Sequence, residues 1–329
     1  MPRPFRKALP FLAAALFAGA CASRLASGGG APAPVREEAP PPARAKTFGS
    51  RQKLDGHENE RRLRVALTED EAFRAAFCAR IGRDGADFLG AEGGGLNEER
   101  VATVLGTKSP GKTDLTLRWR TPEAPRTNVS VKMDENGQVH LTTPERFVAA
   151  WAATFGTNVP PRVAKALGLF FGTDPDAARI LEETPIEIDG ERVRALERSH
   201  NGALCFDVLA HHDAAMAEEL LAWLRDNRRA LTDLCFSRGY AADPDEWAQW
   251  LWYRDAVRPE RGLDRLIRIS DLADAVDALT DEELRTLIRP GPKNGGTTIL
   301  LPFGHLQYLH GKAEFYQSRA KIERLLGRR

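Results

Sequence analysis

The sequence has few cysteines, and their spacing supports no disulfide framework. Cys21, Cys78, Cys205 and Cys235 are scattered over 329 residues, and no two form the Cys-x-x-Cys pair typical of zinc sites. The chain also lacks Gly-x-Ser-x-Gly and His-Glu-x-x-His, so nothing indicates a serine hydrolase or a zinc protease. No run of 18 apolar residues occurs, which excludes an ordinary transmembrane helix.

The chain also lacks an excess of either charge. Its 47 Lys and Arg against 46 Asp and Glu exclude a polycationic nucleic-acid coat and an acidic tail protein. Residues 1–50 hold 7 of the basic and 2 of the acidic residues, which leaves 40 and 44 for the rest of the chain. Any polyanion must therefore bind to a local basic patch.

The N-terminal residues have the order of a secretory signal. Arg3, Arg6 and Lys7 precede an apolar stretch over 8–18, and small residues stand before Cys21. The segment 1–21 resembles a bacterial lipoprotein signal, which implies export and a lipid anchor at Cys21. The alternative is a misplaced start codon and a cytoplasmic protein.

Residues 22–50 are rich in proline and glycine and are interpreted as a linker. The globular domain is expected over 51–329, which is long enough to bury a substantial core. Its hydrophobic pattern predicts helices and strands in the following ranges. Helices are expected over 68–81, 97–105, 144–155, 161–171, 214–234, 245–255, 271–288 and 313–326, and strands over 115–119, 129–133, 139–141, 186–188, 203–209 and 298–303.

The segment from Gly106 to Thr113 matches the phosphate-binding P-loop pattern letter for letter. A P-loop needs a helix directly after its Lys-Thr pair, so that the amino end of the helix faces the phosphates. The residues that follow, 114–119, alternate strictly between polar and apolar and predict a strand. A P-loop nucleotide-binding protein is therefore kept as an alternative that depends on a helix after Thr113.

The two strands over 115–119 and 129–133 predict an antiparallel hairpin. Pairing them about the proline-containing turn brings Asp114 near Lys132, with Thr116, Asn128 and Ser130 on the same polar face. A carboxylate and an ammonium placed in this way suit a Mg²⁺ site at which a water attacks a phosphodiester. Asn136-Gly137 is expected to form a tight turn to the third strand.

At these residues the sequence resembles the PD-(D/E)XK nucleases, in particular restriction-endonuclease-like proteins. The resemblance rests on Gly111-Lys-Thr-Asp114, Asn128-Val-Ser-Val-Lys132 and Gly137-Gln-Val-His140. It implies an α/β fold with a central mixed sheet flanked by helices, a core at about 97–171, and a helical C-terminal elaboration. It also implies Mg²⁺-dependent endonuclease cleavage of DNA without a covalent intermediate.

The resemblance also assigns the site. Asp114 matches the first metal-binding acid and Lys132 the lysine, whereas Ser130 stands where an Asp or Glu is usual. Glu98 or Glu99, just before the strands, is the candidate for the missing metal ligand. Because of Ser130, a catalytically inactive DNA-binding protein of the same fold remains an alternative, and a homodimer is possible.

Basic residues surround this site and suit the phosphates of DNA. Six of them lie within 25 positions that hold only two acidic residues, Asp114 and Glu123. The expected DNA-binding residues are Lys108, Lys112, Arg118, Arg120, Arg126 and His140, beside Lys132 itself. No small-molecule cofactor is expected.

Overall fold

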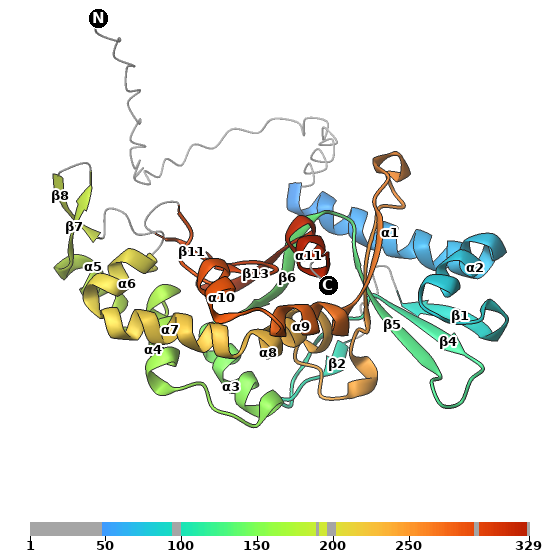
Figure 1. Cartoon of the computed structure of the whole chain (residues 1–329), viewed down its shortest axis with the longest axis horizontal. Coiled ribbons are helices and arrows are strands. Elements are labelled where there is room, and N and C mark those ends of the chain that lie inside the picture. The colour runs from blue at the N-terminus through green and yellow to red at the C-terminus, as the bar shows by residue number, and fades with distance from the viewer. Residues whose placement is uncertain (1–47, 94–99, 189–190, 196–201, 293–295, 328–329) are drawn as a thin grey trace, which may run out of the picture. The chain divides into compact units, whose positions relative to one another are not determined.

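A computed structural model describes residues 48–93, 100–188, 191–195, 202–292 and 296–327. Within the compact unit Lys46–Arg329, helices surround two larger β-sheets (Figure 1). The mixed α/β class, with a central mixed sheet flanked by helices, is confirmed. The signal-like segment 1–21 and the linker up to residue 47 lie outside the described residues.

The central sheet has five strands in the order β1-β4-β5-β9-β10. Their bounds are β1 Phe88–Gly93, β4 Leu115–Trp119, β5 Arg126–Lys132, β9 Trp250–Arg254 and β10 Asp264–Arg268. β4 and β5 form the predicted antiparallel hairpin, and β5 pairs in parallel with β9, so that Val129 lies beside Trp250. The sheet therefore extends well beyond the expected core at 97–171.

Two helices cover one face of this sheet, α1 (Phe48–Glu69) and α2 (Glu71–Arg80) (Figure 1). Asp70 separates them, because its carboxylate accepts the N–H of Phe73 and caps α2. The buried residues between the helices and the sheet are Leu63, Leu67, Phe77, Cys78, Leu115, Leu117, Trp119, Val129, Val131 and Trp252. Each fully buried Leu or Val here contributes roughly 1.5–3 kcal/mol. This core leaves the other face of β4 and β5 for polar side chains.

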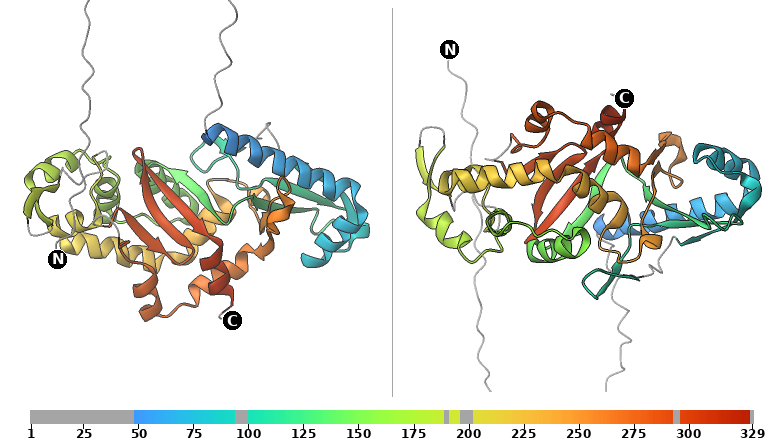
Figure 2. Two further views of the ribbon diagram at one scale, coloured as in Figure 1. Left: turned by 90° about the horizontal axis from the view of Figure 1, so that it is seen from above. Right: turned by 60° about the horizontal axis from the view of Figure 1, so that its bottom comes forward.

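The second sheet has the order β11-β12-β13-β6. Its strands are β6 Asn136–Thr142, β11 Thr298–Leu301, β12 Gly304–Leu309 and β13 Lys312–Ser318, which lie side by side in Figure 2. Asn136 and Gly137 lie within β6, and β6 pairs with β13 instead of β5. The prediction of a tight turn at Asn136-Gly137 between the second and third strands is therefore wrong.

One continuous core joins this second sheet to most of the remaining helices. These helices are α3 Pro144–Phe155, α4 Pro161–Phe170, α5 Ala177–Glu183, α6 Phe206–His212, α7 Ala214–Asp226, α8 Arg228–Asp233, α9 Ile269–Asp277, α10 Asp281–Leu287 and α11 Arg319–Leu326. Leu251 and Tyr253 of β9 also enter this core, so β9 is buried on both faces. Two short hairpins complete the fold, β2 (Arg100–Ala102) with β3 (Lys108–Pro110) and β7 (Pro185–Ile188) with β8 (Glu191–Arg194).

Four further predictions of secondary structure are wrong, each for a physical reason. Within the range 245–255, residues Trp250–Arg254 form β9, because their aromatic side chains fill both faces of a buried strand instead of one helix stripe. The range 313–318 belongs to β13, in which Ala313, Phe315 and Gln317 are buried with period two. Residues 206–209 are helical, since a short apolar run does not distinguish a strand from a buried helix. Residues 100–102 are a strand, and 97–99 lie outside the described residues.

No helix in the described part of the chain is long and apolar enough to cross a membrane.

Candidate active site

The β4 and β5 hairpin carries the predicted polar face. Leu115 pairs with Val129 and Thr116 with Asn128, so the side chains of Asp114, Thr116 and Arg118 share a face with those of β5 at even positions. Leu115, Leu117 and Trp119 are buried on the opposite face against α1 and α2. Strand alternation, fixed by this apolar core, thus sets which residues meet at the site.

Asp114 is held at the start of β4 by three hydrogen bonds. Its N–H donates to the Val129 carbonyl at 2.9 Å, and its carboxylate oxygen Oδ2 accepts the N–H of Val131 at 2.6 Å and the hydroxyl of Ser130 at 3.1 Å. The side chain is one-quarter exposed. The carboxylate is therefore oriented and still reachable from solvent.

Lys132 completes the group. Its ammonium donates to Ser130 Oγ at 3.1 Å and to the Val131 carbonyl at 3.0 Å, and it lies 3.8 Å from Asp114 Oδ2. The Lys132 side chain is 24% exposed. The structure thus brings Asp114, Ser130 and Lys132 together as the sequence predicts, and we call these three residues the hairpin triad.

Ser130 is the buried centre of the hairpin triad, with 3% of its surface exposed. Its hydroxyl donates to the Asp114 carboxylate and accepts from the Lys132 ammonium, so it joins the two charged groups. A serine makes both bonds without adding a charge. The cost is that the site has one carboxylate fewer than the resemblance implies.

Glu98 and Glu99, the candidates for a second carboxylate, lie outside the described residues. A carboxylate that the sequence analysis missed, Glu92, is on β1, directly opposite Thr116. Residues diagonal to each other on neighbouring antiparallel strands lie roughly 7–8 Å apart between Cα atoms, which places Glu92 near Asp114 on the polar face. The sequence alone does not indicate that Glu92 lies opposite Thr116, because a glycine-rich segment separates β1 from β4 along the chain.

Glu92 is paired with Arg118, whose guanidinium lies 2.7 Å from its carboxylate. The hydrogen bond from Arg118 lowers the pKa of Glu92 below its usual value. Both side chains are more than one-third exposed. Glu92 is thus ionised and accessible, on the strand next to Asp114, with its carboxylate turned toward Arg118.

The remaining basic residues divide into exposed and interior ones. Lys108 on β3 and Arg120 after β4 are exposed. Arg126, at the start of β5, is partly exposed and lies 3.9 Å from each of the carboxylates of Asp245 and Glu246. Arg118, Arg120 and Arg126 thus place cationic groups on or next to the β4 and β5 hairpin, whereas Lys108 belongs to the separate hairpin of β2 and β3.

Lys112 and His140 point into the protein, which corrects the expectation that they contact DNA. The Lys112 ammonium donates to the Val139 carbonyl, and burial lowers the pKa of Lys112 to about 8. His140 is 7% exposed and packs edge-on against the ring of Tyr240. Burial lowers the pKa of His140 well below its usual value, so the ring stays neutral.

The P-loop alternative is also corrected. The residues after Thr113 form strand β4, and Lys108–Pro110 within the motif forms β3. The motif lysine, Lys112, is bonded to a main-chain carbonyl inside the protein. The helix amino end and the free lysine that would hold phosphates are both absent from residues 100–119.

No protein-family model and no curated protein sequence matches this chain. A structure comparison finds a restriction endonuclease, MspI, solved in complex with its cognate DNA, with a TM-score of 0.42 and 12% sequence identity. The similarity covers 81% of this chain and 86% of that chain.

Proposed function

We propose that this protein is a Mg²⁺-dependent DNA endonuclease of the restriction-endonuclease-like, PD-(D/E)XK type. The observation that carries the proposal is the hairpin triad: an oriented carboxylate and an ammonium 3.8 Å apart, bridged by one hydroxyl, on neighbouring strands. The apolar core behind the hairpin holds these groups without relying on a flexible loop.

The residues present fit a Mg²⁺ ion with few protein ligands. Mg²⁺ prefers oxygen, keeps several waters and takes one or two carboxylates from a protein. Within the described residues no hydrogen bond reaches the second oxygen of Asp114, so that oxygen is available. Asp114 would hold the ion, with Glu92, Glu98 or Glu99 as the second carboxylate. No cluster of three or more His, Cys, Asp or Glu occurs in the described ranges, so Asp114 is proposed to bind the ion with at most one further carboxylate.

The chain's own residues supply the rest of the chemistry. When bound, the ion acidifies a water and offsets charge on the phosphate. Lys132 places a fixed positive charge beside Asp114, where it orients the attacking water and stabilises the charge that develops on the phosphate oxygens. Ser130 keeps the Lys132 ammonium in this position through its hydroxyl.

DNA would lie across the polar face of the hairpin. Arg118, Arg120, Arg126 and Lys108 provide cationic groups for its phosphates. The globular domain carries a small negative charge, so these local groups decide where a polyanion binds.

A catalytically inactive DNA-binding protein of the same fold is the second candidate. Ser130 favours it, because its hydroxyl replaces the acid that the resemblance implies and already satisfies both charged neighbours. Cleavage separates the two candidates, since both bind DNA and only one hydrolyses it.

The test is incubation of supercoiled plasmid with the purified protein, with and without Mg²⁺. We expect nicked or linear plasmid only with Mg²⁺. Asp114→Asn and Lys132→Ala should each lower the rate by at least about a hundredfold, in the range of single catalytic groups. The matched controls are Asp226→Asn at the exposed end of α7 and Lys312→Ala on the exposed start of β13. Wild-type rates for both site variants would refute the assignment.

Export, lipid attachment at Cys21 and a homodimer remain proposals, of which the first two rest on the N-terminal sequence. Intact-mass analysis of the protein isolated from its native host decides the first two. Loss of residues 1–20 with a lipid mass on Cys21 supports export and a membrane anchor. An intact Met1 without lipid, in the cytosolic fraction, supports the cytoplasmic alternative.

A further inference from the structure

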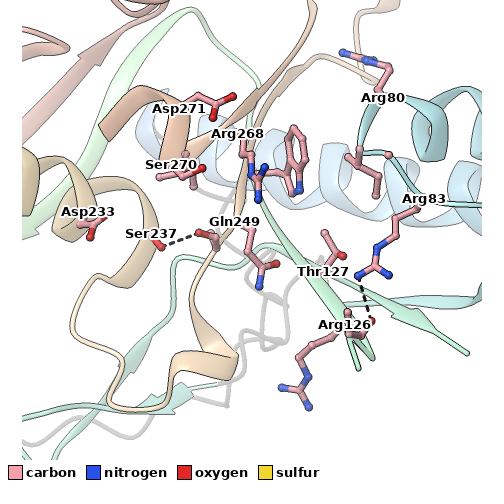
Figure 3. Close-up of a pocket in the computed structure, with 16 residues that line it drawn as sticks. Arg80, Arg83, Arg126, Thr127, Asp233, Ser237, Gln249, Arg268, Ser270 and Asp271 are labelled. Carbon is pink, nitrogen blue, oxygen red and sulfur yellow. Dashed lines mark hydrogen bonds between the residues drawn. The ribbon is translucent and has the colours of Figure 1, made fainter. Parts of the chain in front are cut away.

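A cleft opens at the end of the central sheet where β5 and β9 begin and β10 ends. It has a volume of about 680 Å³ and lies between the end of α2, the start of β5 and the start of α9 (Figure 3). Ligand sites for small molecules measure roughly 300–1,000 Å³, so the cleft has room for a small organic molecule. Its charged lining residues are Arg80, Arg83, Arg126, Arg268, Asp233 and Asp271. Four arginines against two carboxylates give the lining an excess of positive charge.

The cleft faces away from the hairpin triad. Arg268 pairs with Trp250 in the register of β10 and β9, so their side chains share one face of the sheet. On that face Trp250 packs against the core beneath α1 and α2. Arg83 lies 5.4 Å from the ring centre of Trp119, which is buried in the same core. A ligand held by Arg83 and Arg268 therefore does not contact the groups proposed for cleavage, which lie on the opposite, polar face.

Two guanidinium groups of the cleft have donors for an anion. The Arg268 side chain is exposed and makes no hydrogen bond or ion pair within the described residues. Arg83 donates to the Ala124 carbonyl at 3.3 Å and packs on the Trp119 ring, which together fix its guanidinium and leave further N–H donors. A fixed cation binds an anion with little loss of side-chain entropy.

Neutral groups and a carboxylate complete the polar lining. The side-chain carbonyl of Gln249 accepts a main-chain N–H of β5 at 2.6 Å, which leaves the Gln249 NH₂ group as a donor. Ser270 and Asp271 are exposed in the first turn of α9. Asp271 makes no hydrogen bond or ion pair in the described part of the chain, so its carboxylate can accept a hydroxyl group of a ligand. Figure 3 shows Gln249 and Arg268 in the middle of the cleft, between Arg83 on one side and Ser270 on the other.

An aromatic ring lies beside these groups. Trp250 lines the cleft with part of its surface exposed, directly opposite Arg268 across β9 and β10. The planar rings of nucleobases stack on indole rings and on guanidinium planes. Anion donors, a stacking surface and a free carboxylate together match a ligand that has a phosphate, a planar ring and hydroxyl groups. Duplex DNA fits this lining less well, because Asp271 repels neighbouring phosphates and the bases of a duplex are stacked on one another.

We propose that this cleft binds a mononucleotide, with its phosphate on Arg268 and Arg83 and its base against Trp250. The Gln249 amide adds a donor to the phosphate, and Asp271 accepts a ribose hydroxyl. This inference goes beyond the proposed function and does not depend on it, since no residue of the hairpin triad takes part.

The test is isothermal titration calorimetry of the full protein with adenosine monophosphate (AMP), in the absence of divalent ions. AMP is a suitable probe because stacking tolerates any base. We expect one binding site per chain with a dissociation constant below about 1 mM. Arg268→Gln should weaken binding about tenfold, because a charged hydrogen-bond donor to the phosphate is lost. Inorganic phosphate and adenosine should each bind at least about tenfold more weakly than AMP, since each lacks part of the contacts.

Two control variants separate the cleft from other sites. Arg285→Gln removes an exposed arginine of α10 that does not line the cleft, so it should bind AMP like wild type. Lys132→Ala removes the cation of the hairpin triad and should also leave the AMP affinity unchanged, because that residue lies on the opposite face of the sheet. The Arg268 side chain makes no capping bond at the start of α9, so Arg268→Gln should have the urea midpoint of wild type.

Four results would overturn the inference. The first two are an absence of AMP binding and an equal AMP affinity of Arg268→Gln and wild type. Inorganic phosphate that binds as tightly as AMP would indicate a site for an inorganic anion only. A DNA duplex that competes with AMP and loses affinity in Arg268→Gln would indicate a nucleic-acid surface.

Cleavage is a separate readout. A protein that cuts plasmid but binds no AMP would retain the endonuclease and refute the nucleotide site. A protein that binds AMP through Arg268 but cuts no plasmid would do the opposite.

Discussion

Replacement of Ser130 by glutamate tests the site most directly, because it adds the acid that the PD-(D/E)XK resemblance implies. The Ser130 hydroxyl lies 3.1 Å from Asp114 Oδ2 and 3.1 Å from Lys132 Nζ. Ser130→Glu removes both hydrogen bonds, which costs about 2 kcal/mol, and places a second carboxylate about 4 Å from the first. At an effective dielectric constant of 20, two like charges at that distance repel by about 4 kcal/mol, partly offset by Lys132.

Without metal, we therefore expect Ser130→Glu to lower the free energy of unfolding by about 2–4 kcal/mol. A bound Mg²⁺ removes the repulsion, so the variant should regain stability as Mg²⁺ is added. A Mg²⁺ concentration 100 times the dissociation constant should raise the free energy of unfolding by about 2.7 kcal/mol. The measurement is urea denaturation at zero and saturating Mg²⁺, at constant ionic strength.

Ser130→Gln is the control, since glutamine has nearly the same shape as glutamate and removes the same two hydrogen bonds without adding a charge. It should be destabilised by about 2 kcal/mol and respond to Mg²⁺ no more than wild type. If Ser130→Glu gains no more from Mg²⁺ than Ser130→Gln does, residue 130 does not face a metal position and the site assignment is wrong.

Three further predictions concern the surroundings of the site. Glu92→Gln should raise the Mg²⁺ concentration for half-maximal plasmid cleavage about tenfold, because the ion loses a nearby carboxylate; an unchanged midpoint excludes Glu92 from the site. Burial holds the pKa of His140 in the folded protein well below its usual value, so below about pH 6.5 the unfolded chain binds a proton that the folded protein does not. The free energy of unfolding should therefore decrease by up to about 1.4 kcal/mol for each unit by which the pH falls below 6.5. Urea unfolding of His140→Phe should show a smaller decrease, and the same pH dependence as wild type contradicts the burial argument. Asp255→Ala should cost about 3 kcal/mol in urea unfolding, since its fully buried carboxylate is bonded to Arg258 and Arg261; a loss below about 1 kcal/mol contradicts this.

The sequence predicts the hairpin triad because its geometry is local. Alternation of Leu115, Leu117 and Trp119 fixes the face of Asp114, and antiparallel pairing across a short turn brings Lys132 beside it. The approach of Glu92 could not be predicted, because it depends on which strand pairs with the outer edge of β4. The burial of Lys112 could not be predicted either, because it depends on packing against residues that are distant in the sequence.

The same limit applies to the second half of the chain. The aromatic run of β9 has no period of its own, because each face of that strand meets a different apolar core. Four arginines that line one cleft at the end of the central sheet come from α2, the turn after α2, β5 and β10, and no spacing in the sequence relates them. They are Arg80, Arg83, Arg126 and Arg268. Local periodicity thus indicates a strand with one polar face, but not the partners that a strand acquires from far along the chain.

The parallel pairing of β5 with β9 has a consequence for folding. The hairpin can form early from neighbouring residues, but one edge of β5 stays unpaired until β9 arrives from more than a hundred residues later. An unpaired, apolar strand edge is prone to aggregation. A nascent or proteolytically shortened chain that ends before Trp250 should therefore associate with other copies through β5, and this edge should be covered only once residues 250–254 have been synthesised.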